Sequence, residues 1–273
     1  MGALEAIESW PVPTVAAGWR GGDDAPTSIG AASQVFELAS VTKPLVALAV
    51  LVAVEEGSLA LDEPAGPPGS TVAHLLSHAS GLAPEDTENA TLSRLATRRI
   101  YSNHGYEELG RAVERATEFD IATYLKEAIL DPLGMADTYL AGSPAHGAFS
   151  SVDDLLKLGA ELLRPTLLSA ETMSAATTPH WGDLVGVLPG FGRQNPNPWG
   201  LGFEIKGPKD PHWTGSLNSA ETYGHFGRSG TFFWVDPALD LFCVALTDRA
   251  FGPWAAESWP TFSDLVIQAA AAG

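Results

Sequence analysis

Ser40 and Lys43 are the residues whose types and spacing could form a nucleophile and its base. A serine hydroxyl attacks poorly until a base removes its proton, and a lysine amine one helical turn away can remove it once the amine is itself neutral. Of the five lysines in the chain, only Lys43 has a serine three residues upstream. A four-residue motif also arises by chance, so the pair alone is weak support for this chemistry.

Pro44 bears on whether Ser40 and Lys43 share one helical face. A proline is tolerated in the first turn of a helix, but it biases the residue before it away from helical dihedrals. The helix that follows could therefore begin at Ser40 or only at Pro44. The two possibilities place the hydroxyl and the amine differently.

The composition limits the classes of function. The chain has 273 residues, of which 45% are apolar and 18% charged, and its net charge is −18. These values are typical of one large or two small globular domains with a sizeable core. We expect no nucleic-acid or membrane partner, because a phosphate backbone or an anionic membrane attracts a basic face. The single cysteine, Cys243, excludes an internal disulfide, and we expect it to be buried in the apolar run 241–246.

Neither a targeting segment nor a metal site is predicted. Residues 1–10 include two glutamates and no basic residue or apolar core, unlike a secretory signal. The most apolar run, 41–54, is too short to span a membrane. We therefore expect a soluble, cytoplasmic protein, unless a leader has been removed. His74 and His78 are four residues apart but lack the H-E-x-x-H pattern, so we expect no metal and no cofactor.

Apolar patterns predict strands near both termini and helices between them. Strands are expected over 12–19, 34–38, 199–205, 222–226, 231–235 and 241–246. Helices are expected over 41–56, 71–77, 106–117, 121–130, 151–163 and 258–271. Gly57 should end the first helix, and 21–24 should form a hairpin turn. Segment 178–200 has no period and is expected to be a functional loop. The pattern predicts an α+β fold with one antiparallel sheet of about five strands, flanking helices and a mostly helical insertion.

Tyr101-Ser102-Asn103 is a second candidate element. A phenol beside a lysine ammonium can lose its proton more easily and act as a base or relay. The asparagine amide can both donate to and accept from a bound ester or amide. Alternatively, Asn103 caps the next helix and Tyr101 is a packed core residue.

His225-Phe226-Gly227-Arg228 is a third candidate, at the end of a predicted strand. A glycine on a strand edge permits close approach to backbone N–H groups, as an oxyanion hole requires. His225 could donate a hydrogen bond to a substrate carboxylate or carbonyl. Alternatively, it is a half-buried strand histidine without a chemical role.

These three elements, in this order, resemble the serine β-lactamase and penicillin-binding-protein superfamily, whose motifs are S-x-x-K, Y-x-N and K-T-G or H-x-G. The chain looks most like the branch of class C β-lactamases, class VIII esterases and D-aminopeptidases. The resemblance extends from about residue 10 to 270. Further supporting strings occupy 36–44, 74–82, 133–138, 147–155 and 224–237. The resemblance assigns no chemistry to the histidines of 74–82.

The resemblance implies a β-lactamase-like fold and an acyl-enzyme mechanism. Ser40 would be the nucleophile, and Lys43 and Tyr101 would move its proton to the leaving group and then activate water. Asn103 would hold Lys43 and the substrate carbonyl. The backbone N–H groups of Ser40 and Arg228 would form the oxyanion hole. We expect a sheet domain from 1–61 and 200–273, a helical domain from 62–199, and the active site in the cleft between them.

The third motif departs from K-T-G at His225. A lysine there offers a permanent cation to a substrate carboxylate, whereas histidine is mostly neutral at pH 7, although Arg228 could supply a charge. We therefore expect small esters or amides as substrates. One alternative is a β-lactamase or D-alanyl peptidase, and another is an idle scaffold that binds penicillin or another ligand without turnover. Trp181, Trp199 and Trp213 could line the cleft or pack elsewhere. The substrate itself would be selected by the loops 83–99 and 178–200, and the oligomeric state stays open.

Overall fold

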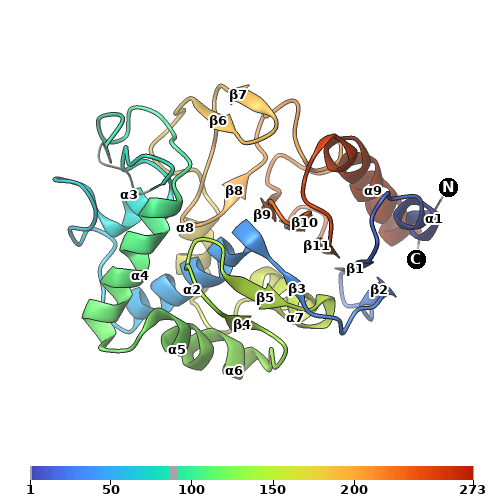
Figure 1. Ribbon diagram of the computed structural model, residues 1–273, viewed down its shortest axis with the longest axis horizontal. Coiled ribbons are helices and arrows are strands. Elements are labelled where there is room, and N and C mark those ends of the chain that lie inside the picture. The colour runs from blue at the N-terminus through green and yellow to red at the C-terminus, as the bar shows by residue number, and fades with distance from the viewer. Residues whose placement is uncertain (1, 86–90, 273) are drawn as a thin grey trace.

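An antiparallel sheet of six strands, in the order β2-β1-β11-β10-β9-β8, forms the centre of the protein in the computed structural model, which describes residues 2–85 and 91–272 (Figure 1). Its strands are β1 (Val15–Gly21), β2 (Thr27–Gly30), β8 (Glu204–Ile205), β9 (Tyr223–Gly227), β10 (Thr231–Asp236) and β11 (Leu241–Thr247). The predicted α+β fold, with a sheet built from both ends of the chain, is confirmed. The sheet has one strand more than expected.

Helices cover both faces of this sheet. Helices α1 (Ala3–Glu8) and α9 (Pro253–Ala272) lie together on one face, near both termini, and α7 (Val152–Leu163) packs on the other face (Figure 1). Strands β10 and β11 are therefore buried along their whole length, as is typical of a sheet covered on both sides. In α7, a side chain at Gly159 would enter the Phe242 ring, so the glycine allows the helix to approach the sheet closely.

Helix α2 (Thr42–Glu55) runs through the core and carries the start of the candidate site. Every residue from 42 to 53 is buried, as expected of a helix that is apolar on all sides. It ends before Gly57, whose φ of +78° suits glycine, so the predicted helix over 41–56 is confirmed to within one residue at each end. A 3₁₀ turn, η1 (Ala39–Val41), leads directly into it. Pro44 is the third helical residue, where no intrahelical N–H bond is required.

Helices make up most of the regular secondary structure in the segment between the strands. It contains α3 (Val72–Leu76), α4 (Asn103–Thr117), α5 (Ile121–Leu125), a π-helical turn η2 (Lys126–Leu130), α6 (Asp131–Leu133), α7 and α8 (Ala170–Ala176). The predicted helices are present, although α4 begins three residues early, α9 begins five residues early, and α1, α6 and α8 were not predicted. Because α7 lies against β1 and β11, one helix of the 62–199 range contacts the main sheet. The division into two domains stays a prediction.

Two small sheets differ from the sequence-based expectation. The predicted strand over 34–38 is reduced to β3 (Phe36–Glu37), and it joins β5 (Ala148–Ser150) and β4 (Tyr139–Leu140) rather than the main sheet. The predicted loop over 178–200 contains a hairpin, β6 (Gly186–Leu188) and β7 (Gly192–Gln194). Its strands pair mainly with each other, so no apolar alternation marks them in the sequence.

Two further expectations concern single features of the chain. Cys243 lies on β11, is fully buried, and has a free thiol whose pKa is raised by burial, so the expectation of a buried side chain is confirmed. Within residues 2–85 and 91–272, no helix is both long enough and apolar enough to cross a membrane.

Candidate active site

The first turn of α2 brings Ser40 and Lys43 together. The Lys43 Nζ lies 3.4 Å from the Ser40 Oγ, so the 3₁₀ turn and the helix keep the two side chains on one face despite Pro44. Ala39, directly before the serine, has a φ of +45°, a left-handed conformation that a non-glycine residue adopts only under strain. The strained turn lifts the half-buried Ser40 towards the pocket while Lys43 stays fully buried.

Lys43 is held by neutral acceptors. Its Nζ donates to the Asn103 Oδ1 at 2.7 Å and to the Ala145 carbonyl at 2.8 Å. Burial lowers the pKa of Lys43 to about 7, and the more distant carboxylates of Glu85 and Glu107 only partly oppose this. A neutral amine has two N–H bonds and one lone pair. With both N–H bonds directed at these two acceptors, the lone pair is left for the Ser40 hydroxyl.

Asn103 lies at the start of α4, but it does not cap the helix. The Ser102 Oγ accepts the capping hydrogen bond from the Gly105 N–H at 3.0 Å. The Asn103 amide is therefore free to bridge Lys43 and Glu85, whose Oε1 accepts from its Nδ2 at 2.7 Å. The alternative in which Asn103 is the helix cap is wrong. The amide instead fixes the position of the lysine amine.

Tyr101 faces both Ser40 and Lys43. The Lys43 Nζ lies 4.6 Å from the centroid of its ring, and its hydroxyl interacts with Ser40. We expected the ammonium to ease loss of the phenolic proton. The pKa of Tyr101 is shifted in the opposite direction: burial raises it far above the pKa of Lys43. At neutral pH the phenol is a proton donor, and the amine is the group that can accept a proton.

His78 contacts the segment that carries Tyr101 and Ser102. Its Nδ1 accepts from the Ser102 N–H at 3.1 Å, and its ring lies 4.7 Å from the Tyr101 ring. No sequence pattern connects this histidine with the site, because their proximity depends on the packing of α3 against α4. Glu85, Glu107 and Ala145 were also missed, since no motif includes them.

The end of β9 forms the opposite wall. A side chain at Gly227 would collide with the Leu38 carbonyl and the Thr231 hydroxyl. The glycine therefore lets β9 pack against η1, which brings Arg228 beside Ser40 in the same pocket. We had expected the glycine to permit close approach of a substrate. The structure shows that it permits close approach of the protein's own backbone instead. His225 is buried beside Tyr101, whereas Arg228 is exposed.

Two hollows meet at Ser40, and both are also lined by Glu85, Asn103 and Arg228. The first is a mainly apolar pocket of about 310 Å³, and its lining includes Tyr101, Trp199, His225, Phe226 and Phe251. It adjoins a larger apolar groove, with which it shares Pro84, Tyr101 and Pro189. The second is a polar cleft of about 440 Å³, lined by Glu37, Ala39, Ser40, Glu85, Asn103, His146, Arg228 and Ser229.

The three tryptophans considered for the cleft have different positions. Trp199 lines the apolar pocket. Trp213 is buried in the core beneath α9, among Phe226, Phe232 and neighbouring rings. Trp181 stacks on His74 with ring centroids 3.9 Å apart, outside the lining of the pocket. Only the first of the three contributes to the wall.

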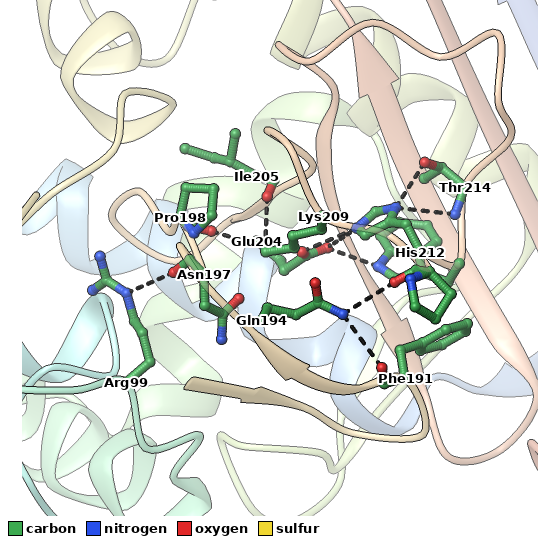
Figure 2. A network of polar contacts seen from close by, with 12 residues as sticks. Arg99, Phe191, Gln194, Asn197, Pro198, Glu204, Ile205, Lys209, His212 and Thr214 are labelled. Atoms are coloured by element: carbon green, nitrogen blue, oxygen red, sulfur yellow. Dashed lines mark hydrogen bonds and ion pairs between the residues drawn. The ribbon is translucent and has the colours of Figure 1, made fainter. Parts of the chain in front are cut away.

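A buried polar network anchors the pocket wall that includes the β6–β7 hairpin (Figure 2). The Glu204 carboxylate accepts from Lys209, from the His212 Nε2 at 3.0 Å and from the Trp213 Nε1 at 2.7 Å. Lys209 also donates to the Ile205 and Pro198 carbonyls. Together these bonds attach the segment carrying Trp199 to β8.

Side chains that could hold a metal do not gather in this site. Across the described ranges, 2–85 and 91–272, no three His, Cys, Asp or Glu residues are placed to bind one ion. The His74 and His78 rings have other partners: His74 accepts from or donates to Thr71, and His78 accepts from Ser102.

Comparison with known proteins agrees with this geometry. The sequence profile of the Beta-lactamase family matches residues 14–267. A crystal structure of a beta-lactamase from Mycobacterium bovis is 52% identical, covers 98% of this chain and 99% of its own, and superposes with a TM-score of 0.95. Esterase EstB from Burkholderia gladioli is 28% identical over 80% of this chain and 78% of its own length. A simvastatin synthase from Aspergillus terreus, at 18% identity and a TM-score of 0.78 over 99% of this chain and 94% of its own, shares the fold. The chain therefore belongs to the Beta-lactamase family, within the superfamily that its three motifs predicted.

Proposed function

We propose that the protein is a serine hydrolase that cleaves small esters or amides through an acyl-enzyme on Ser40. The observation that carries the proposal is the environment of Lys43. Its amine is buried, has a pKa near 7, and donates to two neutral acceptors beside the Ser40 hydroxyl. A base of this pKa is half deprotonated at neutral pH, as general-base catalysis requires.

Acylation follows from the positions of the three side chains. Neutral Lys43 takes the proton of Ser40, whose oxygen forms a bond to the substrate carbonyl carbon. The backbone N–H groups of Ser40 and Arg228 stabilise the resulting oxyanion. As the bond to the leaving group breaks, the Tyr101 hydroxyl protonates that group, and the Lys43 ammonium returns a proton to the phenol. Asn103 keeps the amine aligned throughout.

Deacylation reverses these roles. A water molecule gives its proton to Lys43, directly or through Tyr101, as its oxygen attacks the acyl carbon. The bond to the Ser40 oxygen then breaks, and the same proton restores the hydroxyl. The product acid leaves, and the net reaction consumes one water.

Each of the two hollows would bind a different part of the substrate. Because Tyr101 donates to the leaving group and lines the apolar pocket but not the polar cleft, the leaving alcohol or amine occupies the apolar pocket. A small acyl group then lies in the polar cleft with Asn103 and Arg228. Similarity to an esterase supports esters as one substrate class. The proposal includes a cytoplasmic location and no partner other than the small acyl substrate.

The test is turnover of p-nitrophenyl acetate by wild type and Ser40→Ala. We expect a burst of p-nitrophenol, an acetyl group on the Ser40 peptide by mass spectrometry, and loss of both in the variant. Exposed Ser174 on α8 provides the matched control, since Ser174→Ala should retain wild-type rates. Full activity in Ser40→Ala would show that another residue is the nucleophile.

β-Lactam hydrolysis is the second candidate, because a relative that is 52% identical is a beta-lactamase. A β-lactam brings a carboxylate, and the neutral His225 replaces the lysine that would bind it. We therefore expect nitrocefin to be hydrolysed more slowly than short p-nitrophenyl esters. A nitrocefin rate above the ester rate would favour the second candidate. A penicillin adduct that persists in intact mass spectra would instead indicate a scaffold that acylates without turnover.

A further inference from the structure

His225 lines the apolar pocket, and one nitrogen of its ring is buried. It lies on β9, directly after the residues that pair with β8, Tyr223 and Gly224, and it is one of the residues that line the hollow. Only 4% of the residue is exposed. Its ring lies 5.7 Å from the Tyr101 ring and 5.6 Å from the Trp199 ring, between centroids. The histidine is therefore part of the built wall of the pocket.

The hydrogen bonds of His225 define which nitrogen carries the proton. Its Nδ1 lies 2.7 Å from the Phe226 carbonyl oxygen. A carbonyl only accepts, so Nδ1 must donate and carries the hydrogen. Burial and the nearby Lys43 lower the pKa of His225 to about 3, which keeps the ring neutral. Nε2 is then an unprotonated nitrogen with a lone pair, and it can only accept.

This acceptor has no protein partner. Within the described part of the chain, the His225 Nε2 is buried and makes no hydrogen bond. A buried acceptor without a donor is unfavourable, so a ligand that supplies the donor binds more tightly than one that cannot. A carboxylate offers no donor. It would also meet the buried carboxylate of Glu204, which lines the same pocket.

We infer that the leaving group of the natural substrate is a neutral alcohol or amine that carries a second hydrogen-bond donor, received by the His225 Nε2. The inference rests on the proposed function, which places the leaving group beside Tyr101. The expected role of His225 as a donor to a carboxylate is thereby reversed. The Tyr101 and His225 rings are neighbours, with centroids 5.7 Å apart, so one small leaving group can reach both residues. Trp199, Phe226 and Phe251 would contact the apolar body between them.

Aryl acetates provide a matched substrate series. The 3- and 4-hydroxyphenyl acetates carry the donor at two positions, and the corresponding methoxyphenyl acetates have leaving groups of similar acidity without the donor. The 3- and 4-carboxyphenyl acetates carry an anion instead. We expect one hydroxyphenyl isomer to exceed its methyl ether about tenfold in kcat/KM, which is the size of one buried hydrogen bond. The carboxyphenyl esters should be the poorest substrates.

Variants at position 225 show whether this selectivity comes from the imidazole. In His225→Phe the ratio of hydroxyphenyl to methoxyphenyl rates should fall to about one. In His225→Lys the carboxyphenyl esters should gain most, because an ammonium replaces the acceptor. A preference for methyl ethers or carboxylates in wild type at both ring positions would overturn the inference, as would a hydroxyl preference that survives in His225→Phe.

The tautomer can be measured without substrate. In ¹⁵N-detected imidazole spectra, with His225 assigned by its absence in His225→Phe, we expect Nδ1–H and a bare Nε2 from pH 6 to 8. A proton on Nε2 would overturn the inference while leaving the proposed function intact. If p-nitrophenyl acetate forms no adduct on Ser40, the proposed function itself fails. The two failures are therefore distinguishable.

Discussion

Two lysines in this protein are buried, but their hydrogen-bond acceptors differ in charge. Lys43 donates to an amide oxygen and a backbone carbonyl, and it makes no direct ion pair within the described residues. Lys209 donates to the Glu204 carboxylate as well as to the Pro198 and Ile205 carbonyls. Both amines have lost nearly all contact with water. The chemical nature of one partner separates them.

That partner determines what each amine can do. Without a contacting carboxylate, burial outweighs the more distant Glu85 and Glu107 and lowers the pKa of Lys43 to about 7, so the amine can exchange protons at neutral pH. Burial also lowers the pKa of Lys209, but the contacting Glu204 opposes this shift, and the pKa of the Glu204 carboxyl is itself lowered to about 2 by His212 and Lys209. Lys209 is thus an element of a charged network. A buried lysine becomes a base when its hydrogen-bond acceptors are neutral.

The largest expected effect follows from removal of the Lys43 amine. Lys43→Met keeps a long unbranched side chain but removes the base that we propose for Ser40. We expect kcat for p-nitrophenyl acetate to fall about 10³-fold, within the range attributed to general-base catalysis. The stability of the variant, measured by urea unfolding, should remain close to that of wild type or above it, because a desolvated amine has been removed. A loss of less than tenfold would assign the base to another group.

Lys209→Met should have the opposite profile. The substitution leaves the Glu204 carboxylate buried with only His212 and Trp213 as donors, and breaking a buried ion pair in this way costs about 3 kcal/mol or more. We expect lower unfolding free energy in urea, with a smaller change in kcat for the protein that remains folded. The pair Lys126 and Asp131 is the control, since both side chains are more than half exposed. Lys126→Met should change stability by less than about 1 kcal/mol. Equal losses in the two variants would contradict a special role for the buried network.

The difference between the two lysines marks what the sequence could predict. The motifs have fixed spacing and order, and this made it possible to propose five site residues from the sequence: Ser40, Lys43, Tyr101, Asn103 and His225. The groups that shift the pKa values of these residues have no fixed spacing from them in the sequence. The Ala145 carbonyl approaches Lys43 from a distant segment, and Glu204 meets Lys209 only because the chain turns back after β8. Directions of pKa shifts, such as that of Tyr101, depend on burial and therefore also required the structure.

The sequence likewise predicted some elements of the fold well and others poorly. Long periodic or uniformly apolar segments, such as α2 and β11, were located to within a residue or two because burial dictates their composition. Elements stabilised by single local interactions were missed or misplaced. The hairpin of β6 and β7 has no apolar alternation, and the start of α4 depends on the cap supplied by Ser102.

Asn103→Asp would make Lys43 resemble Lys209. A carboxylate in place of the Oδ1 that accepts from Lys43 at 2.7 Å favours the ammonium and raises the pKa of the amine. In wild type, kcat/KM should rise with pH around a midpoint near 7, because only the neutral amine accepts the serine proton. In the variant we expect this midpoint to move upward by about one unit, so that activity at pH 7 falls roughly tenfold and returns by pH 9.

Glu85→Gln provides the matched change of opposite sign. Glu85 raises the pKa of Lys43 from a distance, so its removal should lower the midpoint of the same profile. Asn103 also contacts Glu85, and the double variant Asn103→Asp/Glu85→Gln removes the repulsion between the two carboxylates. It should retain an upward shift relative to Glu85→Gln alone. If the midpoint stays fixed in all three variants while kcat falls, the profile reports another group and Lys43 is not the titrating base.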